Sequence, residues 1–223
     1  MSRIRDNALS IAFMALFLVC LAGQALAGML DYNEQQLVGG GQPVGYLDYI
    51  TSSNFAVNVA ENWQSEYLQF LLFILFTIWM VQRGSPESKE PGEEGAESDE
   101  KQQIGRYAEA DSPAWARVKG LRLWLYSNSL GLTMGAIFVL SWLAQSVAGV
   151  ASYNAERLGD LRDPVSWSSY VTSPDFWNRS LQNWQSELLA VLSMVVLSIY
   201  LRQRGSPESK PVGAAHTATG VEG

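Results

Sequence analysis

The chain carries the same pair of polar motifs twice, at a constant spacing of 121 residues. The motifs are Asn62–Glu66 (NWQSE) with Arg83–Lys89 (RGSPESK), and Asn183–Glu187 with Arg204–Lys210. Residues 7–89 align with residues 128–210 without a gap. Between the motifs most positions exchange one apolar residue for another, so only apolarity is required there. The pattern predicts a tandem duplication of one helical unit.

Composition favours a helical membrane protein over a water-soluble globule, because 48% of the 223 residues are hydrophobic and eight are tryptophan. The net charge of -7 is partly local, since nine acids and three bases lie in residues 84–114. An acidic tract of this kind does not suit a nucleic-acid partner. Cys20 and His216 are the only residues of their kinds, which argues against disulfides, metal sites and histidine catalysis. We therefore expect no cofactor and no metal.

The N-terminal apolar segment has two interpretations. Arg3 and Arg5, followed by an apolar stretch and Ala25-Leu26-Ala27, match a secretory signal peptide. The copy of this segment at residues 129–149 lies in mid-chain, where no signal peptide is cleaved. We expect an uncleaved transmembrane helix from Ala8 to about Leu30, with cleavage left as the alternative.

The second helix of each unit has a capping signal at its start. Ser173-Pro174-Asp175 provides a hydroxyl, a proline at the first helical position and an acid in the first turn. The apolar core at 67–81, or 188–201, is shorter than the roughly 20 residues that span a bilayer. Trp63 and Trp184 are therefore expected to anchor the helix in the interface. Gly84 and Gly205 are expected to cap its end.

These features predict an all-α fold with four transmembrane helices in two tandem, pseudo-symmetric hairpins and interfacial extracytoplasmic loops. The predicted domains are a first hairpin at 1–89, an acidic disordered cytoplasmic linker at 90–112, a second hairpin with a preceding interfacial helix at 113–210, and a disordered tail at 211–223. Twelve of the fifteen basic residues lie on the side of both termini and the linker. The positive-inside rule then places both termini in the cytoplasm.

Glu66 and Glu187 are the main candidate functional residues, because an ionisable group at membrane depth is costly. Gln24 follows Asn7 by 17 residues, and Glu66 precedes Arg83 by 17, which puts both side chains about 25 Å from the cytoplasmic end of their helices. Gln24 is therefore expected to face Glu66, and Gln145 to face Glu187.

Two roles remain open for this candidate polar membrane site, which includes the motif residues Gln64 and Gln185. In the first role, the carboxylates bind a cation or relay protons. In the second role, the glutamate, glutamine and tryptophan side chains fix how two helices dock. The basic residues of the two RGSPESK motifs also have two interpretations. Arg83, Lys89, Arg204 and Lys210 either bind lipid phosphate or serve only as interfacial anchors beside a helix cap.

At these motifs the chain resembles a family of small bacterial membrane proteins classed as a domain of unknown function. The resemblance rests on Asn62–Glu66, Gly84–Lys89 and Tyr32-Asn33, with their copies, and it implies no activity. We expect a multi-pass bacterial inner-membrane protein with a structural or interaction role in the cell envelope and no enzymatic activity. Its expected partners are the lipid bilayer and a second copy or another membrane protein. The alternative is an ion or proton pathway through an oligomer, using the paired glutamates.

Overall fold

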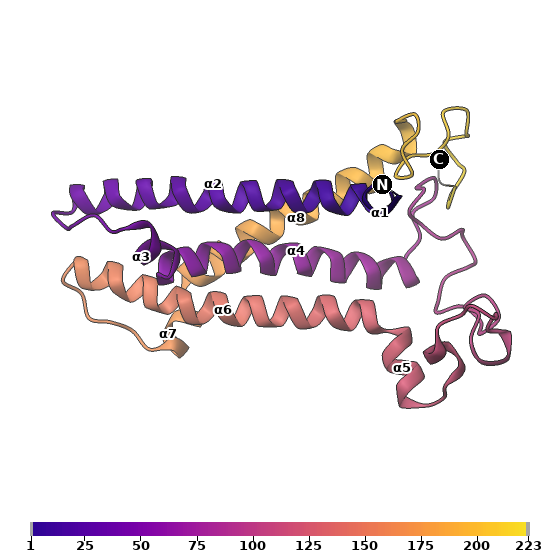
Figure 1. The fold of residues 1–223 in the computed structure, drawn as a ribbon, viewed down its shortest axis with the longest axis horizontal. Helices are drawn as coiled ribbons and strands as arrows, with labels where there is room; N and C mark the ends of the chain where they lie inside the picture. The colour runs from indigo at the N-terminus through magenta and orange to yellow at the C-terminus, as the bar shows by residue number, and fades with distance from the viewer. Residues whose placement is uncertain (1, 222–223) are drawn as a thin grey trace. The chain divides into compact units, whose positions relative to one another are not determined.

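A computed structural model describes residues 2–221, which form eight α-helices, two short 3-10 helices and no strand. The long helices are separated by short ones (Figure 1). In chain order the elements are α1 (Ser2–Asp6), α2 (Ala8–Val38), α3 (Tyr46–Ile50), α4 (Ser53–Trp79), η1 (Gly105–Tyr107), η2 (Ala114–Arg117), α5 (Leu121–Ser127), α6 (Ser129–Gly159), α7 (Trp167–Val171) and α8 (Pro174–Tyr200). The prediction of an all-helical chain is confirmed for this part of the protein.

The bounds of α2, α3 and α4 recur 121 residues later as those of α6, α7 and α8. The loops between these helices are fastened in the same way. The Asn33 amide donates to the Val44 carbonyl at 3.0 Å and accepts from the Val44 amide at 2.7 Å. Asn154 makes the same pair of bonds to Val165, at 2.9 and 2.8 Å. Each asparagine thus ties the end of a long helix to the start of the next short one.

The helix starts agree with the capping signals, and the helix ends do not. The Ser52 hydroxyl accepts from the Phe55 amide at 3.2 Å, and that of Ser173 from Phe176 at 3.3 Å. Helix α2 continues to Val38 rather than ending near Leu30, because no glycine or proline follows Leu30 before Gly39. Helices α4 and α8 end at Trp79 and Tyr200. The expected caps Gly84 and Gly205 lie beyond these ends, in turns with φ of +89° and +81°.

The acidic linker and the segment after it contain turns and short helices. Lys89 forms an ion pair with Glu97 at 2.9 Å, and Lys101 forms one with Glu93 at 2.8 Å. The expected interfacial segment before the third long helix corresponds to η2 and α5, with Trp115 and Tyr126 ring centroids 6.2 Å apart. The predicted domain boundaries stay predictions.

The chain separates into two compact units, Met1–Ala60 with Leu143–Phe176, and Glu61–Trp142 with Trp177–Gly223. In the first unit Tyr49 and Tyr170 form the centres of two matching clusters. The Tyr49 ring lies 5.7 Å from Tyr32 and 5.6 Å from Phe55, centroid to centroid. The Tyr170 ring lies 5.3 Å from Tyr153 and 5.5 Å from Phe176. Both tyrosines are buried, so each cluster is a small core beneath a loop.

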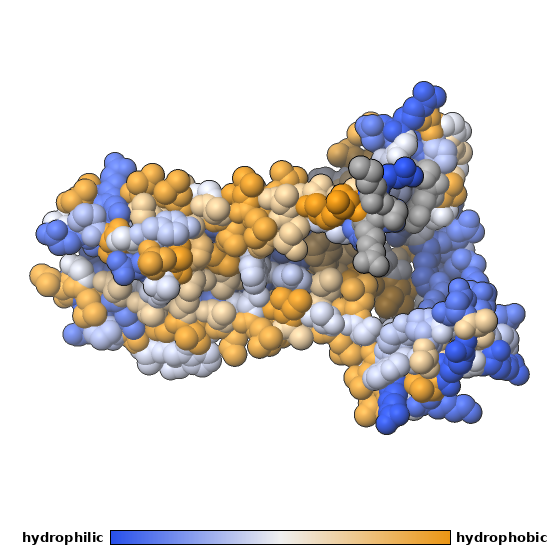
Figure 2. All heavy atoms as spheres, viewed as in Figure 1, coloured by the Kyte–Doolittle hydropathy of each residue, from blue (hydrophilic) through white to orange (hydrophobic). Residues whose placement is uncertain are grey.

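Two of the described helices, α2 and α6, are long and apolar enough to cross a membrane, which weakly suggests a membrane protein. Only 6% of the apolar window of α2 and 22% of that of α6 is buried. Figure 2 shows mainly hydrophobic residues along the visible face of the long helices and mainly hydrophilic residues in the linker. Neither helix is the enclosed core of a globule.

Candidate functional site

The NWQSE motifs meet through a partly buried hydrogen bond in the second unit. The indole nitrogen Nε1 of Trp184 on α8 donates to Oε1 of Gln64 on α4 at 2.6 Å. Gln64 is 0% exposed, whereas its counterpart Gln185 is exposed. The two motifs are identical in sequence but differ in environment. One glutamine receives the tryptophan of the other motif, and the other glutamine faces outward.

An aromatic cluster surrounds this bond. The ring centroid of Trp142 lies 5.9 Å from those of Trp177 and Trp184, and Phe138 stacks on Trp142 at 5.8 Å. The Trp142 indole also donates to the Ser180 hydroxyl at 3.4 Å. Trp63, expected to match Trp184 as an interfacial anchor, is 42% exposed. The tryptophan of the second motif therefore packs inside the unit, and that of the first lies at its surface.

The candidate glutamates lie on these same two helices. Glu66 is exposed and Glu187 is half-buried. The charge of Glu66 acts on Glu187, so the two carboxyl groups belong to one electrostatic environment. Their expected partners Gln24 and Gln145 fall in the first unit, where Gln145 is buried and Gln24 half-buried. The pairing of each glutamine with a glutamate remains a prediction.

An ion pair near the start of the motif joins α4 to α8. Nη1 of Arg179 lies 3.7 Å from Oε1 of Glu61. The Glu61 side chain is 14% exposed, so water screens this pair less than it would a pair on the surface. Helices α4 and α8 are thus joined by one charged contact and one neutral hydrogen bond within a few residues of each other.

The RGSPESK motifs form tight turns that hold a glutamate between two serines. In the first copy the Ser88 hydroxyl accepts from the Gln82 amide at 2.8 Å, and the Ser85 hydroxyl accepts from the Glu87 amide at 3.3 Å. In the second copy Ser209 and Ser206 make the same bonds to Gln203 and Glu208, at 2.9 and 3.2 Å. The motif therefore specifies the path of the backbone on both sides of its glutamate.

The lysines of these motifs bind protein groups. Nζ of Lys210 donates to the carbonyls of Gly84 at 2.6 Å, His216 at 3.0 Å, and Ala215 and Ala218 at 3.2 Å each. Lys210 is 1% exposed, although it was expected to be an interfacial anchor. Lys89 donates to Gly95 at 2.6 Å besides pairing with Glu97. Arg83 and Arg204 remain exposed.

Glycine is required at position 84 because the first turn lies directly against the last part of the chain. A Cβ atom at Gly84 would lie 2.4 Å from the carbonyl oxygen of His216. The Gly84 amide donates to the Thr219 hydroxyl at 2.9 Å, and the Gly220 amide donates to the Ser85 carbonyl at 3.1 Å. The residues predicted as a disordered tail thus supply the hydrogen-bond partners of the first turn.

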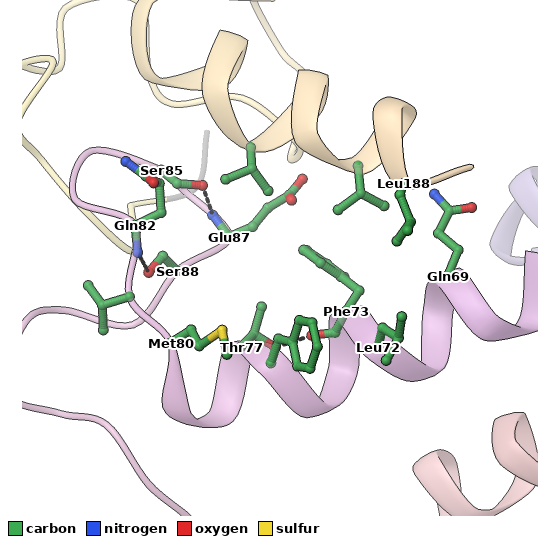
Figure 3. Close-up of a pocket in the computed structure, with 14 residues that line it drawn as sticks. Gln69, Leu72, Phe73, Thr77, Met80, Gln82, Ser85, Glu87, Ser88 and Leu188 are labelled. Carbon is green, nitrogen blue, oxygen red and sulfur yellow. Dashed lines mark hydrogen bonds between the residues drawn. The ribbon is translucent and has the colours of Figure 1, made fainter. Parts of the chain in front are cut away.

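A cavity of about 350 Å³ opens beside the first turn, between α4 and α8 (Figure 3). Its walls come from Leu72, Phe73, Phe76, Met80, Val81, Leu188, Val191 and Val195, and its polar atoms from Gln69, Thr77, Gln82, Ser85, Glu87 and Ser88. Burial raises the pKa of Glu87, and the charge of Glu208 and a hydrogen bond to that residue raise it further. Glu87 therefore lies at one end of an apolar cavity, close enough to Glu208 for that residue to act on its pKa.

Glu87 and Glu208 are not among the functional residues predicted from the sequence. Both belong to the repeated motif, and the retention of their identity between copies was the available signal. Their contact depends on how α4 and α8 pack, which the motif alone does not specify. Among residues 2–221 no group of three or more His, Cys, Asp or Glu side chains could hold a metal ion.

The comparisons with known proteins give a family and no relative of known activity. No curated protein matches the chain, and no solved structure does. Residues 1–221 match the family described as Domain of unknown function (DUF6766). Because this match covers nearly the whole chain, the protein belongs to that family of unknown function.

Proposed function

We propose that the chain is a multi-pass protein of the bacterial inner membrane with a structural or interaction role and no enzymatic activity. In this proposal a tandem duplication provides two helical hairpins, α4 and α8 span the bilayer together with α2 and α6, and both termini are cytoplasmic. The partners are the lipid bilayer and a second copy or another membrane protein, with no role for nucleic acid.

The exposure of the long helices supports membrane insertion. A core helix of a soluble protein is mostly buried, whereas most of the apolar 18-residue stretch of α2 and of α6 is exposed. A signal sequence lies near the N-terminus, and α6 begins only at Ser129. Large exposed apolar side chains continue along the second halves of α4 and α8, namely Phe70, Leu75, Phe76, Leu188, Leu189, Leu192 and Leu197. Such surfaces are stable in hydrocarbon and promote aggregation in water.

The bond from Trp184 to Gln64 is the observation that carries the structural role. These two motif side chains bind each other. Gln64 is fully buried, and its side-chain oxygen accepts the proton of the half-buried Trp184 indole. Because a buried acceptor without a partner costs about 1–3 kcal/mol, the bond favours one docking arrangement of the two helices.

The ion or proton pathway is the second candidate, and one observation favours it. Glu66 and Glu187 lie close enough for their charges to interact, so a cation near both carboxyl groups would be attracted by each. Since Glu66 is exposed in the single chain, this pathway needs a second copy to enclose it. The ion or proton pathway therefore includes an oligomer as part of the proposal.

A flux measurement separates the two candidates. The wild type and a Glu66→Gln, Glu187→Gln double variant are reconstituted in proteoliposomes at matched density, and proton, sodium and potassium fluxes are recorded. The structural proposal predicts wild-type fluxes equal to those of empty liposomes. Flux in the wild type that the double variant loses would contradict it and support the pathway.

A matched pair of motif variants tests the structural role directly. Gln64→Leu removes the acceptor of the Trp184 indole and is expected to lower the free energy of unfolding in detergent by about 1–3 kcal/mol. Gln185→Leu changes the same residue type in the same motif at an exposed position, and an effect within about 0.5 kcal/mol is expected. Equal effects of the two variants would show that the buried bond does not stabilise the docking of the helices.

A further inference from the structure

The cavity beside the first RGSPESK turn combines apolar walls with a single charged group. Glu87 is the only ionisable residue that lines it. No lysine, arginine or histidine within residues 4–221 forms an ion pair with Glu87 or Glu208. A cavity of about 350 Å³ falls within the size range of small-molecule sites, which are mainly apolar with a few fixed polar groups.

The turn holds the Glu87 carboxyl group toward the cavity. Ser85 accepts a hydrogen bond from the Glu87 amide, and the Ser88 hydroxyl accepts from the Gln82 amide and donates to the Lys89 carbonyl at 3.0 Å. Figure 3 shows the Glu87 side chain extending from this turn into the space between the two helices, with Phe73 beside it and Gln69 toward the far end. The serines hold the backbone on both sides of Glu87, which fixes where its side chain begins beside the cavity.

The charges around this carboxyl group select the sign of a ligand. Glu208, held in the second turn by Ser206, lies close enough for its charge to act on Glu87. Lys89 is bound to Glu97 and Gly95, and Lys210 is enclosed by carbonyl groups. Arg83 and Arg204 are exposed, and neither forms an ion pair with Glu87. A cation is therefore attracted to this end of the cavity, and an anion is repelled.

The apolar walls select the remainder of the ligand. A hydrated metal ion would leave Phe73, Met80, Leu188 and Val195 without a partner, and the cavity offers only one carboxyl group for coordination. An amphipathic cation matches both parts, because its hydrocarbon body packs against the apolar side chains and its ammonium group meets the carboxylate. Phe73 and Phe76 also present rings that favour a cationic or aromatic ligand.

We propose that this cavity binds a hydrophobic ammonium ion, with the apolar body between α4 and α8 and the charge beside Glu87. The ligand donates from its ammonium nitrogen to the Glu87 carboxylate, and the proton of the hydrogen bond between Glu87 and Glu208 is released to solvent. This assigns a role to the Ser-Pro-Glu-Ser core of the motif that is separate from helix docking through Gln64. The site does not require the proposed structural role.

The test uses three probes that share one body and differ in charge. They are 4-phenylbutylammonium, 4-phenylbutan-1-ol and 4-phenylbutyrate. Binding to the full-length protein in lipid nanodiscs is measured by isothermal titration calorimetry at pH 8, and the signal from empty nanodiscs is subtracted to remove partitioning into lipid. We expect saturable binding of the ammonium probe, at least tenfold weaker binding of the alcohol, and no binding of the carboxylate.

Three variants locate the site. Glu87→Gln is expected to weaken binding of the ammonium probe at least tenfold while leaving that of the alcohol unchanged. Val195→Phe fills the cavity without changing its charge and is expected to abolish binding of both. Glu100→Gln removes an exposed linker carboxylate outside the cavity and is expected to leave all affinities unchanged. Near-ultraviolet circular dichroism of each variant verifies that it is folded.

Several outcomes would overturn the proposal. Equal affinity for the ammonium and the alcohol would show that the cavity recognises only the apolar body. Tighter binding of the carboxylate would identify an anion site. Saturable binding that persists in both folded Glu87→Gln and folded Val195→Phe would place the ligand elsewhere, and absence of saturable ammonium binding to the wild type would refute the site.

Discussion

Gly28 on α2 allows the Tyr49 ring to approach the helix backbone, and adding one methyl group tests this contact. A Cβ atom at Gly28 would lie 2.3 Å from the Tyr49 hydroxyl oxygen and 3.1 Å from Cζ. Tyr49 is buried, its hydroxyl is hydrogen-bonded to Asn58, and its ring packs on Tyr32 and Phe55. The ring therefore cannot move away without disturbing the loop cluster.

The magnitude follows from a control on the same helix. At Gly23 an added Cβ meets nothing within 4 Å, so Gly23→Ala is expected to stabilise the protein by about 0.5–1 kcal/mol through helix propensity alone. Gly28→Ala gains the same propensity but carries an overpacking cost of about 1–3 kcal/mol. The two alanine variants should therefore differ by about 1–3 kcal/mol in the free energy of unfolding.

Removing the hydroxyl should relieve most of the clash. In a double-mutant cycle of Gly28→Ala with Tyr49→Phe, the closest remaining ring carbons lie at 3.1 and 3.3 Å, so we expect a favourable coupling of about 1–2 kcal/mol. At the matching position, Gly149→Ala would still meet Cε1 and Cζ of Tyr170 at 2.8 and 2.9 Å. Tyr170→Phe should rescue that variant less.

The assay is reversible unfolding in mixed detergent micelles, followed by far-ultraviolet circular dichroism with increasing sodium dodecyl sulfate. If Gly28→Ala stabilises the protein as much as Gly23→Ala does, the proposed close approach of Tyr49 is wrong. A coupling near zero in the cycle would show that the hydroxyl is not the source of the cost.

Two further predictions concern the RGSPESK turns. Burial and the neighbouring Glu208 raise the pKa of Glu87. The stability that its protonated form contributes is therefore fully present below the ordinary glutamate pKa of 4.5 and is lost as pH rises through the raised pKa, so the free energy of unfolding should fall over that range. A Glu87→Gln variant with an unchanged pH profile would refute this assignment. Acetic anhydride should acetylate Lys210 at least tenfold more slowly than Lys101, as followed by mass spectrometry, because Lys210 is 1% exposed and its ammonium is held by four carbonyls. Burial and the charge of Arg202 also lower the pKa of Lys210, which alone would speed the reaction, so equal rates at the two lysines would show that the carbonyl cage opens freely.

Local signals in the sequence were sufficient for the helical class and the helix starts. The serine before each second helix is a cap with a specific partner, and Ser173 occupies the expected place. The ends of α4 and α8 were not predictable from glycine and proline alone. The Ser88 hydroxyl binds the Gln82 amide, and this bond shapes the turn well beyond Trp79, where α4 ends.

The candidate site was predicted in part, because sequence gives residue types and spacing but not which copy of a motif is buried. Gln64 and Gln185 have identical neighbours from Asn to Glu, yet only Gln64 receives a tryptophan indole. The meeting of Glu87 with Glu208 depends in the same way on tertiary packing. Exact symmetry of sequence therefore did not predict the asymmetry of the contacts.

The bond from Lys210 to the Gly84 carbonyl has a consequence for synthesis of the chain. The two residues are 126 positions apart, so at about 5–20 residues per second the ribosome makes the lysine roughly 6–25 s after the glycine. During this interval the first turn has neither its ammonium ligand nor the Thr219 hydroxyl that accepts from the Gly84 amide. The hydrogen bonds of the first turn to the end of the chain can therefore form only late in translation.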